Sequence, residues 1–297
     1  MENKREINKL KCWVIAARPK TLLAAIVPVV VGSAVAANQN KFVLLYSLIA
    51  LFCSILIQVG TNLSNDYYDF IKGADNEKRK GPLRVMVSGL ITGNEMKAGI
   101  AFVFLTAFIA GLYLVYTGGF IVLAIGVASI LAGMAYTAGP FPLAYHGLGD
   151  IFVFMFFGVV GTMGTYFVQA HEFTLLCFLS SIPVGALITN ILVVNNYRDI
   201  EEDREAHKFT LAVILGRTFT RYQFIFLLWV SFIVPIVFYF NLNFRFWIFL
   251  PYLTLPMAFK LSRMLFKSDG KELNNMLELT AQFSGIFGLL FSAGILL

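Results

Sequence analysis

The sequence predicts an all-α protein that crosses a membrane nine times. Of its 297 residues, 58% are hydrophobic and 13% are charged, whereas soluble globular domains have about 45–50% apolar and about 25% charged residues. Stretches such as 101–115, 151–168 and 224–240 carry no charged residue. Runs of this kind approach the ~20 residues that cross a bilayer as a helix. Their length excludes a soluble protein with an unusually large core.

The first element is a polar and basic segment, residues 1–20, in which Trp13 stands where an interfacial anchor would lie. We expect no cleavable signal peptide and a single transmembrane domain over residues 1–297. Hydropathy then indicates nine spans, which begin near Thr21, Phe42, Lys97, Gly119, Gly149, Phe173, Arg221, Phe244 and Met276.

The number of basic residues differs between the loops on the two sides of the membrane. The N-terminal segment and the loops after the second, sixth and eighth spans hold every Lys and Arg except Lys41 and Arg245. By the positive-inside rule the rich side, with the N-terminus, is cytoplasmic. This bias accounts for the net charge of +6, so we assign no nucleic-acid partner and expect contact with anionic lipid headgroups instead.

The first of two acidic clusters lies at the cytoplasmic end of the second span. Asn62, Asn65, Asp66 and Asp69 have the i, i+3, i+4, i+7 spacing of one helix face. Asp75 follows Gly73, which can end the helix and turn Asp75 back to the same side. An aspartate at the bilayer centre costs about 2.5–3.5 kcal/mol. We therefore expect this face to line a cavity or to lie at the interface.

The second cluster ends the sixth span on the same side of the membrane. Asn195, Asp199 and Asp203 are spaced i, i+4, i+8 and again share one face. The Asn-x₃-Asp element thus occurs twice, starting at Asn65 and Asn195, which is weak evidence for a duplicated helical unit.

These residue types suit a Mg²⁺-diphosphate complex. Mg²⁺ takes oxygen ligands and is usually held by one or two carboxylates together with substrate phosphates and water. Two facing carboxylate sets are suited to hold two or more such ions across one diphosphate. The cations that would neutralise the remaining phosphate charge are Lys72, Arg79, Arg84, Arg198 and Lys208. No Cys or His set has the spacing of a zinc site.

Solvated charges at helix ends are the competing explanation. We favour it for the run 78–80 and for the glutamates of the second cluster, Glu201, Glu202 and Glu205. It does not account for polar stripes that run into membrane helices. For Asn65, Asp69, Asn195 and Asp199 we therefore favour function.

An ordered set of motifs resembles the UbiA superfamily of membrane aromatic prenyltransferases, and within it the branch that prenylates 1,4-dihydroxy-2-naphthoate. The resemblance covers nearly the whole chain. Its most specific segments are residues 17–21 (Ala-Arg-Pro-Lys-Thr), 65–75, 81–84, 136–143, 147–150, 164–166 and 195–199.

The resemblance implies nine helices around a central cavity, with both acidic motifs at its cytoplasmic mouth and Mg²⁺ as cofactor. It implies catalytic roles for Asp69, Asp199, Lys72 and Arg198. The metal ligands that we expect are Asn65, Asp66, Asp69, Asp75, Asn195, Asp199 and Asp203. The substrate-binding residues that we expect are Asn65, Lys72, Arg79, Arg84, Tyr136, Asn195 and Lys208.

The implied reaction transfers a polyprenyl group from a polyprenyl diphosphate to 1,4-dihydroxy-2-naphthoate, with loss of CO₂ and diphosphate, and gives a demethylmenaquinol. Residues 206–212 depart from the family pattern, because His207 and Phe209 replace a glycine and a polar residue while Lys208 is retained. Loop closure and acceptor preference are the properties that this departure would affect.

Two kinds of alternative stay open from the sequence. One is a related prenyltransferase that uses another aromatic acceptor, such as 4-hydroxybenzoate, homogentisate or a naphthoquinol. The other is a membrane transporter, although its acids would be expected near the bilayer midplane rather than at helix ends. A phosphotransferase that acts on CDP-alcohols is disfavoured, because its Asp-x₂-Asp-Gly-x₂-Ala-Arg element is missing from the sequence.

Overall fold

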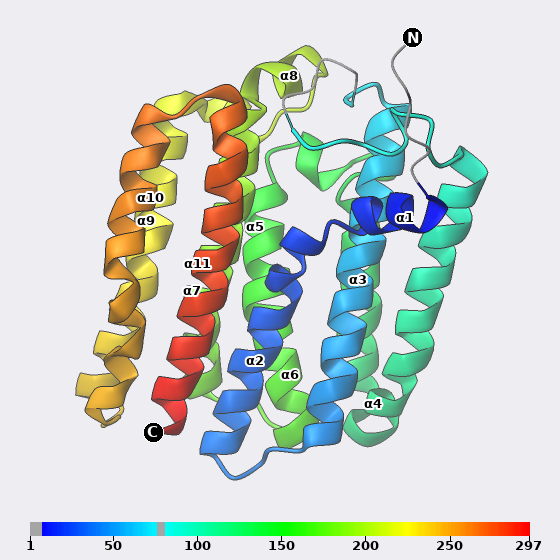
Figure 1. Ribbon diagram of the computed structural model, residues 1–297. Coiled ribbons are helices and arrows are strands. Elements are labelled where there is room, and N and C mark those ends of the chain that lie inside the picture. The colour runs from blue at the N-terminus through cyan, green and yellow to red at the C-terminus, as the bar shows by residue number, and fades with distance from the viewer. Residues whose placement is uncertain (1–7, 76–80) are drawn as a thin grey trace.

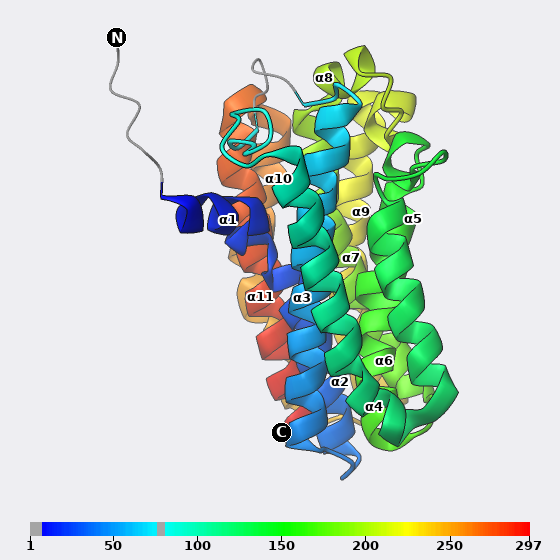
Figure 2. The same cartoon turned by 90° about the vertical axis from the view of Figure 1, so that its right-hand side faces the viewer.

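A computed structural model describes residues 8–75 and 81–297, and all regular elements in these two ranges are helical. The chain forms a bundle whose long helices run nearly side by side (Figures 1 and 2). Its long elements are α2 (Leu23–Asn38), α3 (Leu44–Ile71), α4 (Gly93–Ala135), α7 (Leu175–Arg198), α9 (Leu211–Asn241), α10 (Leu255–Lys267) and α11 (Leu273–Leu296). An all-α membrane fold, as the sequence predicts, is confirmed.

Short helices lie at one end of the bundle. Helix α1 (Lys9–Ala17) lies across the bundle against α3, and α8 (Ile200–Glu205) lies at that end of the bundle (Figures 1 and 2). Between α1 and α2 the chain bends by 50°, where Arg18 adopts a left-handed backbone conformation before Pro19 starts a short 3₁₀ turn. The C-terminus lies at the opposite end.

Six helices of the described chain are long and apolar enough to cross a membrane, or seven if the bent pair of α1 and α2 counts as one span. The number nine stays a prediction. The two spans expected at Lys97 and Gly119 belong to one helical element, α4, which is interrupted at Gly119 (φ 70°, ψ −158°).

Helix α4 folds back on itself at Gly119. A straight helix would separate Phe104 and Gly133 by about 44 Å at 1.5 Å per residue, yet a Cβ placed on Gly133 would lie 3.8 Å from the Phe104 ring. The arms 93–118 and 120–135 therefore form a hairpin. Both arms reach α3, since Gly60 faces the Phe104 ring and Gly133 faces Thr61.

One helical span, Gly149–Ala170, changes its helical type along its length. It consists of α5 (Gly149–Val153), a π-helical segment η3 (Phe154–Val160) and α6 (Gly161–Ala170). Gly158 brings this span against α7, because a Cβ there would approach the Gly185 Cα to 2.5 Å. Close helix contact thus accounts for Gly158, whereas Gly161 and Gly164 also border the cavity described below.

The main apolar core joins α2 and α7 to the C-terminal helices. Phe224, Phe238, Phe283 and Phe287 are almost fully buried in it. The cavity lies on the other side of α7, between α2, α3, both arms of α4 and η3.

Candidate active site

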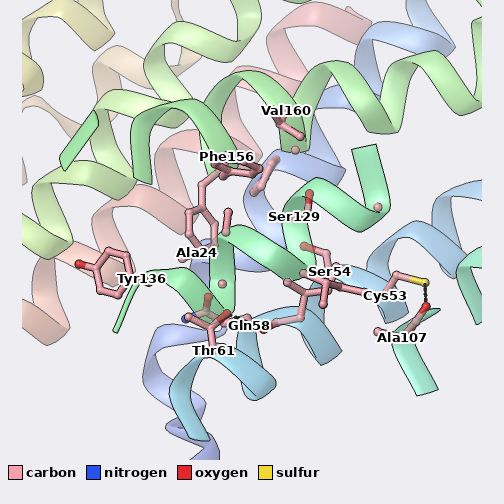
Figure 3. Close-up of a pocket in the computed structure, with 18 of the residues that line it drawn as sticks. Ala24, Cys53, Ser54, Gln58, Thr61, Ala107, Ser129, Tyr136, Phe156 and Val160 are labelled. Atoms are coloured by element: carbon pink, nitrogen blue, oxygen red, sulfur yellow. Dashed lines mark hydrogen bonds between the residues drawn. The ribbon is translucent and has the colours of Figure 1, made fainter. Parts of the chain in front are cut away.

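The helices enclose a cavity of about 340 Å³ that is polar at one end and apolar over the rest of its length. Figure 3 shows part of its wall, with Gln58 and Thr61 of α3 on one side and Phe156 and Val160 of η3 on another. The polar end is lined by Arg18, Asn65, Asp69, Arg84, Asn195 and Lys208. The apolar part includes Phe108, Leu112, Val122, Ile125 and Phe152. A cavity of this form suits a long apolar molecule with a charged head.

Asp69 is a carboxylate at the polar end of the cavity, and it is only 3% exposed. The hydroxyl of Tyr145 donates a 2.9 Å hydrogen bond to Asp69 Oδ1. Arg84 Nη2 and Lys208 Nζ each lie 3.8 Å from Asp69 Oδ2, beyond hydrogen-bonding distance. One buried carboxylate thus stands between a phenol and two cations.

The turn after α3 brings Asp75 back toward the same site, as predicted. Gly73 has a φ of 72°, and Asp75 N donates to Asp69 O at 3.3 Å. Arg84 Nε lies 2.9 Å from Asp75 Oδ2, and both side chains are buried. Arg84 therefore links Asp69 and Asp75 into one charged cluster.

Lys72 lies over the Tyr145 ring, 4.7 Å from its centroid, and donates to Thr137 O at 2.7 Å. Burial lowers the pKa of Lys72, while the negative charge of Asp69 acts in the opposite direction. Burial and the adjacent Asp69 carboxylate raise the pKa of Tyr145, so its phenol stays protonated and remains a donor.

The second motif is arranged differently from the first. Arg198 is 1% exposed and donates from Nε and Nη2 to both carboxylate oxygens of Asp199, each at 2.6 Å. The same guanidinium donates to Asn195 Oδ1 at 2.7 Å and to Asn274 Oδ1 of α11 at 2.8 Å. Arg198 and Asp199 do not border the cavity, whereas Asn195 does. Arg198 holds Asp199 rather than facing a ligand.

The segment with the departures from the family pattern closes over Tyr145. Lys208 Nζ lies 3.5 Å from Asp203 Oδ1 and 5.6 Å from the Tyr145 ring centroid. Phe209 N donates to Tyr145 O at 3.1 Å, in an isolated parallel bridge between His146 and Phe209. His207 has a φ of 53°, a conformation that a glycine adopts at no steric cost. The loop is thus closed in this chain without the glycine.

The other predicted site residues are distributed as follows. Asn65 accepts a 3.0 Å hydrogen bond from the Thr137 hydroxyl, and Tyr136 lines the cavity. Asp66 accepts from Val85 N at 3.3 Å and does not border the cavity. Arg79 lies outside the described residues.

Two residues, Arg18 on the cavity wall and Tyr145 behind Asp69, were not predicted. Tyr145 comes from a 3₁₀ turn, η2 (Leu143–Tyr145), and has no periodic pattern to mark it. Arg18 belongs to the motif at residues 17–21, but a basic residue before a span is equally expected from topology. Its left-handed conformation and its place on the cavity wall are visible only in the fold.

The donors on the cavity wall fit Mg²⁺ that arrives with a diphosphate. Asn65, Asp69 and Asn195 offer hard oxygen atoms, which Mg²⁺ prefers. In the described part of the chain, no three His, Cys, Asp or Glu side chains are grouped to hold a metal by themselves. The substrate's phosphate oxygens and water would have to complete such a site.

Together, the fold and the site define a multi-pass membrane protein whose interior cavity ends in a buried cluster of carboxylates, amides and cations. The sequence pattern of the UbiA prenyltransferase family matches residues 25–284. The chain belongs to this family.

Curated relatives match along the whole length. The chain is 36% identical to the 1,4-dihydroxy-2-naphthoate octaprenyltransferase of Haemophilus influenzae, with all of both chains covered. It is 38% identical to the enzyme of the same name from Escherichia coli, with 99% of this chain and 97% of that one covered. The Bacillus subtilis enzyme of that name is 31% identical over 94% of this chain and 90% of its own.

Solved structures share the fold at low sequence identity. A UbiA homologue from Aeropyrum pernix superposes with a TM-score of 0.72 at 15% identity and covers 92% of this chain and 97% of its own. A homologue from Archaeoglobus fulgidus bound to GPP and Mg²⁺ gives a TM-score of 0.66 at 16% identity, with 96% and 100% covered.

Proposed function

We propose that the protein transfers a polyprenyl group from a polyprenyl diphosphate to 1,4-dihydroxy-2-naphthoate, with release of CO₂ and diphosphate. Two relatives named 1,4-dihydroxy-2-naphthoate octaprenyltransferase are 36% and 38% identical over essentially the full chain. The product would be a demethylmenaquinol, which places the protein in menaquinone biosynthesis.

The observation that carries the proposal is the polarity of the cavity. Its charged end holds Asp69, Arg84 and Lys208, and its remaining length is lined mainly by aliphatic and aromatic side chains. A polyprenyl diphosphate has the same division, with an anionic head and an apolar tail. The substrate would therefore bind with its diphosphate against Asn65 and Asn195 and its tail between α3, α4 and η3.

The charged side chains would act on the leaving diphosphate. Prenyl transfer breaks the allylic C–O bond, and negative charge grows on the diphosphate as the bond lengthens. Lys72, Arg84 and Lys208 would stabilise that charge from fixed positions. Asn65, Asp69 and Asn195 would hold Mg²⁺ with the substrate, and bound Mg²⁺ would supply further positive charge to the diphosphate.

Tyr145 and Arg198 would position the two acidic motifs. Tyr145 donates to Asp69, and Arg198 binds both oxygens of Asp199. Asp66, Asp75, Asp199 and Asp203 remain proposed metal ligands. None of these four borders the cavity, so each would need to turn toward it to reach a ligand there.

We further propose that the protein works as one domain in the cell membrane, with its N-terminus and the polar end of the cavity in the cytoplasm. The distribution of basic residues supports this orientation. The polyprenyl substrate would enter from the lipid phase.

The proposal is tested by mass analysis of the products from a panel of acceptors. Purified protein is supplied with Mg²⁺, a polyprenyl diphosphate and, in turn, 1,4-dihydroxy-2-naphthoate, 4-hydroxybenzoate and homogentisate. We expect a prenylated product from the naphthoate that has lost its carboxyl group. Prenylation of 4-hydroxybenzoate without reaction of the naphthoate would contradict the proposal.

A further inference from the structure

Gln58 is a buried polar side chain in the wall of the cavity that the site described above does not use. It lies on α3, two turns before Asn65, and is 8% exposed. Figure 3 shows it among the residues around the cavity. No described residue donates a hydrogen bond to its Oε1 atom. An unsatisfied buried carbonyl oxygen costs about 1–3 kcal/mol, so its presence calls for an explanation.

The hydrogen bonds of Asn62 determine which atom Gln58 presents to the cavity. Asn62 Nδ2 donates to Ala17 O at 2.9 Å, a carbonyl that can only accept. The amide of Asn62 is thereby oriented, and its Oδ1 faces Gln58 as an acceptor. Gln58 Nε2 donates to that oxygen at 3.4 Å. Gln58 Oε1 is then the carbonyl oxygen without a partner. It can only accept, and the second N–H of Nε2 is a separate donor.

The hydroxyl groups nearby are committed to other acceptors. Thr61 donates to Ile57 O at 2.9 Å and Ser54 donates to Ala25 O at 2.9 Å. Ser129, on the second arm of α4, donates to Ile125 O at 2.8 Å. Among the described residues, these hydroxyls therefore do not donate to Gln58 Oε1. A bound molecule can supply the donor.

We propose that Gln58 is an acceptor-binding residue whose Oε1 accepts a hydrogen bond from a phenolic hydroxyl of the aromatic substrate. This inference rests on the proposed function, because 1,4-dihydroxy-2-naphthoate carries two such donors. The substrate's carboxylate cannot be the partner of Oε1, since two acceptors would face each other. At 1.5 Å per residue, Gln58 lies about 10 Å deeper along α3 than Asn65, on the apolar side of the diphosphate end.

The hydrogen bond would also affect reactivity. A carbonyl oxygen that accepts from a phenol increases electron density on the ring. The ring carbon that attacks the prenyl group lies next to one hydroxyl, so Gln58 would both select a hydroxylated ring and favour its attack. No bond to Gln58 forms or breaks in this role.

The test compares Gln58→Met with the wild-type protein in an equilibrium binding measurement without prenyl donor, by calorimetry. The ligands are 1,4-dihydroxy-2-naphthoate and the two analogues that each lack one hydroxyl, 1-hydroxy-2-naphthoate and 4-hydroxy-2-naphthoate. We expect Gln58→Met to raise the dissociation constant of the dihydroxy compound roughly 3- to 10-fold. One of the two analogues lacks the hydroxyl that Gln58 binds. The substitution should leave the dissociation constant of that analogue unchanged.

A second measurement separates this role from a general loss of structure. The dissociation constant of a polyprenyl diphosphate should be the same in wild type and Gln58→Met. Thr106→Val is the matched control, because the Thr106 hydroxyl bonds only within its own helix, to Phe102 O, and does not border the cavity. It should change neither constant.

Failure of the inference and failure of the proposed function give different results. If the wild type prenylates the naphthoate but Gln58→Met binds all three ligands as well as the wild type does, the inference is wrong and the function stands. Equal weakening of all three ligands would mean that Gln58 holds only water or supports the helix, and would also overturn it. If the wild type neither binds nor prenylates the naphthoate, the proposed function fails and the inference fails with it.

Discussion

At the scale of single residues, Asp69 combines the properties that a diphosphate site requires. Its carboxylate is buried and borders the cavity. Oδ1 accepts a hydrogen bond from Tyr145, whereas Arg84 and Lys208 both lie near Oδ2. A buried carboxylate without an opposite charge nearby destabilises a protein. The cations provide that charge in the ligand-free protein, and they are the groups that a diphosphate would engage.

We predict that Asp69→Asn lowers the rate of prenyl transfer at least ~100-fold while the protein still folds. The amide oxygen can still accept the hydrogen bond from Tyr145, so mainly the negative charge is lost. The rate of product formation in detergent provides the measurement. Asp269→Asn, at an exposed side chain far along the chain, is the control. Near-normal turnover by Asp69→Asn would contradict a metal role for this carboxylate.

We predict that Tyr145→Phe lowers the turnover rate by roughly 10-fold, the value of about one lost hydrogen bond to a charged group. The phenylalanine keeps the ring beneath Lys72 and Lys208 but no longer orients Asp69. The concentration of Mg²⁺ that gives half-maximal activity should rise as well. A lower rate with an unchanged Mg²⁺ requirement would argue against the positioning role.

Arg198 makes a prediction about stability rather than chemistry. Removing one partner of a buried ion pair costs about 3–5 kcal/mol, so Arg198→Met should lower the thermal midpoint clearly in detergent. Arg204→Met removes an exposed partner of Glu201 and should cost at most about 1 kcal/mol. Similar midpoints for the two variants would show that the Arg198–Asp199 pair does not stabilise the fold.

The pattern of residues predicted part of this site. Helical spacing predicted that Asn65 and Asp69 share one helix face, and Gly73 predicted that Asp75 turns back to the same side. The pairing of Asp75 with Arg84 is visible only in the structure. The pattern did not reveal that Asp66 accepts from Val85, which belongs to another segment, or that Asp199 pairs with its neighbour Arg198, because helical spacing does not specify side-chain partners. Tyr145 and Gln58 were not predicted for the same reason.

At the scale of elements, the hairpin of α4 forms one side of the cavity. Its turn at Gly119 has φ 70° and ψ −158°, a region of conformation that is essentially limited to glycine. Hydropathy predicted a new span at this glycine. The π-helical segment of residues 154–160 was not predictable, since its sequence is as apolar as that of a regular helix.

We predict that Gly119→Ala destabilises the protein by about 1–3 kcal/mol through backbone strain. Gly126→Ala is the matched control on the second arm, where a Cβ meets no atom within 4 Å and the backbone is helical. Thermal unfolding of both variants in the same detergent makes the comparison. Equal midpoints would mean that the turn does not depend on glycine.

At the scale of the whole molecule, the two ends of the bundle differ in charge. The end with α8 carries the basic loops and the polar part of the cavity, and the other end contains Lys41 and Arg245. This asymmetry followed from the sequence alone, because loop charge depends only on the order of spans. The shape of the cavity could not be predicted from the sequence, because that shape depends on how the helices pack.

We predict that a cysteine introduced at Leu83 is labelled from the cytoplasmic side only, and one at Phe173 from the opposite side only. Both positions are exposed, at 53% and 52%. The native cysteines Cys12, Cys53 and Cys177 are buried, so they should contribute little background. A membrane-impermeant maleimide applied to intact cells and to inverted vesicles distinguishes the two sides. Labelling of the Leu83 position in intact cells would reverse the proposed orientation.

The most direct test of the account is the stoichiometry of the reaction itself. Purified protein is incubated with Mg²⁺, a polyprenyl diphosphate and 1,4-dihydroxy-2-naphthoate labelled in its carboxyl group, and released CO₂ and diphosphate are counted together. Prenyl transfer with decarboxylation predicts equal amounts of the two, and loss of both in Asp69→Asn. Release of diphosphate without CO₂, or a wild-type protein that releases neither, would contradict the account.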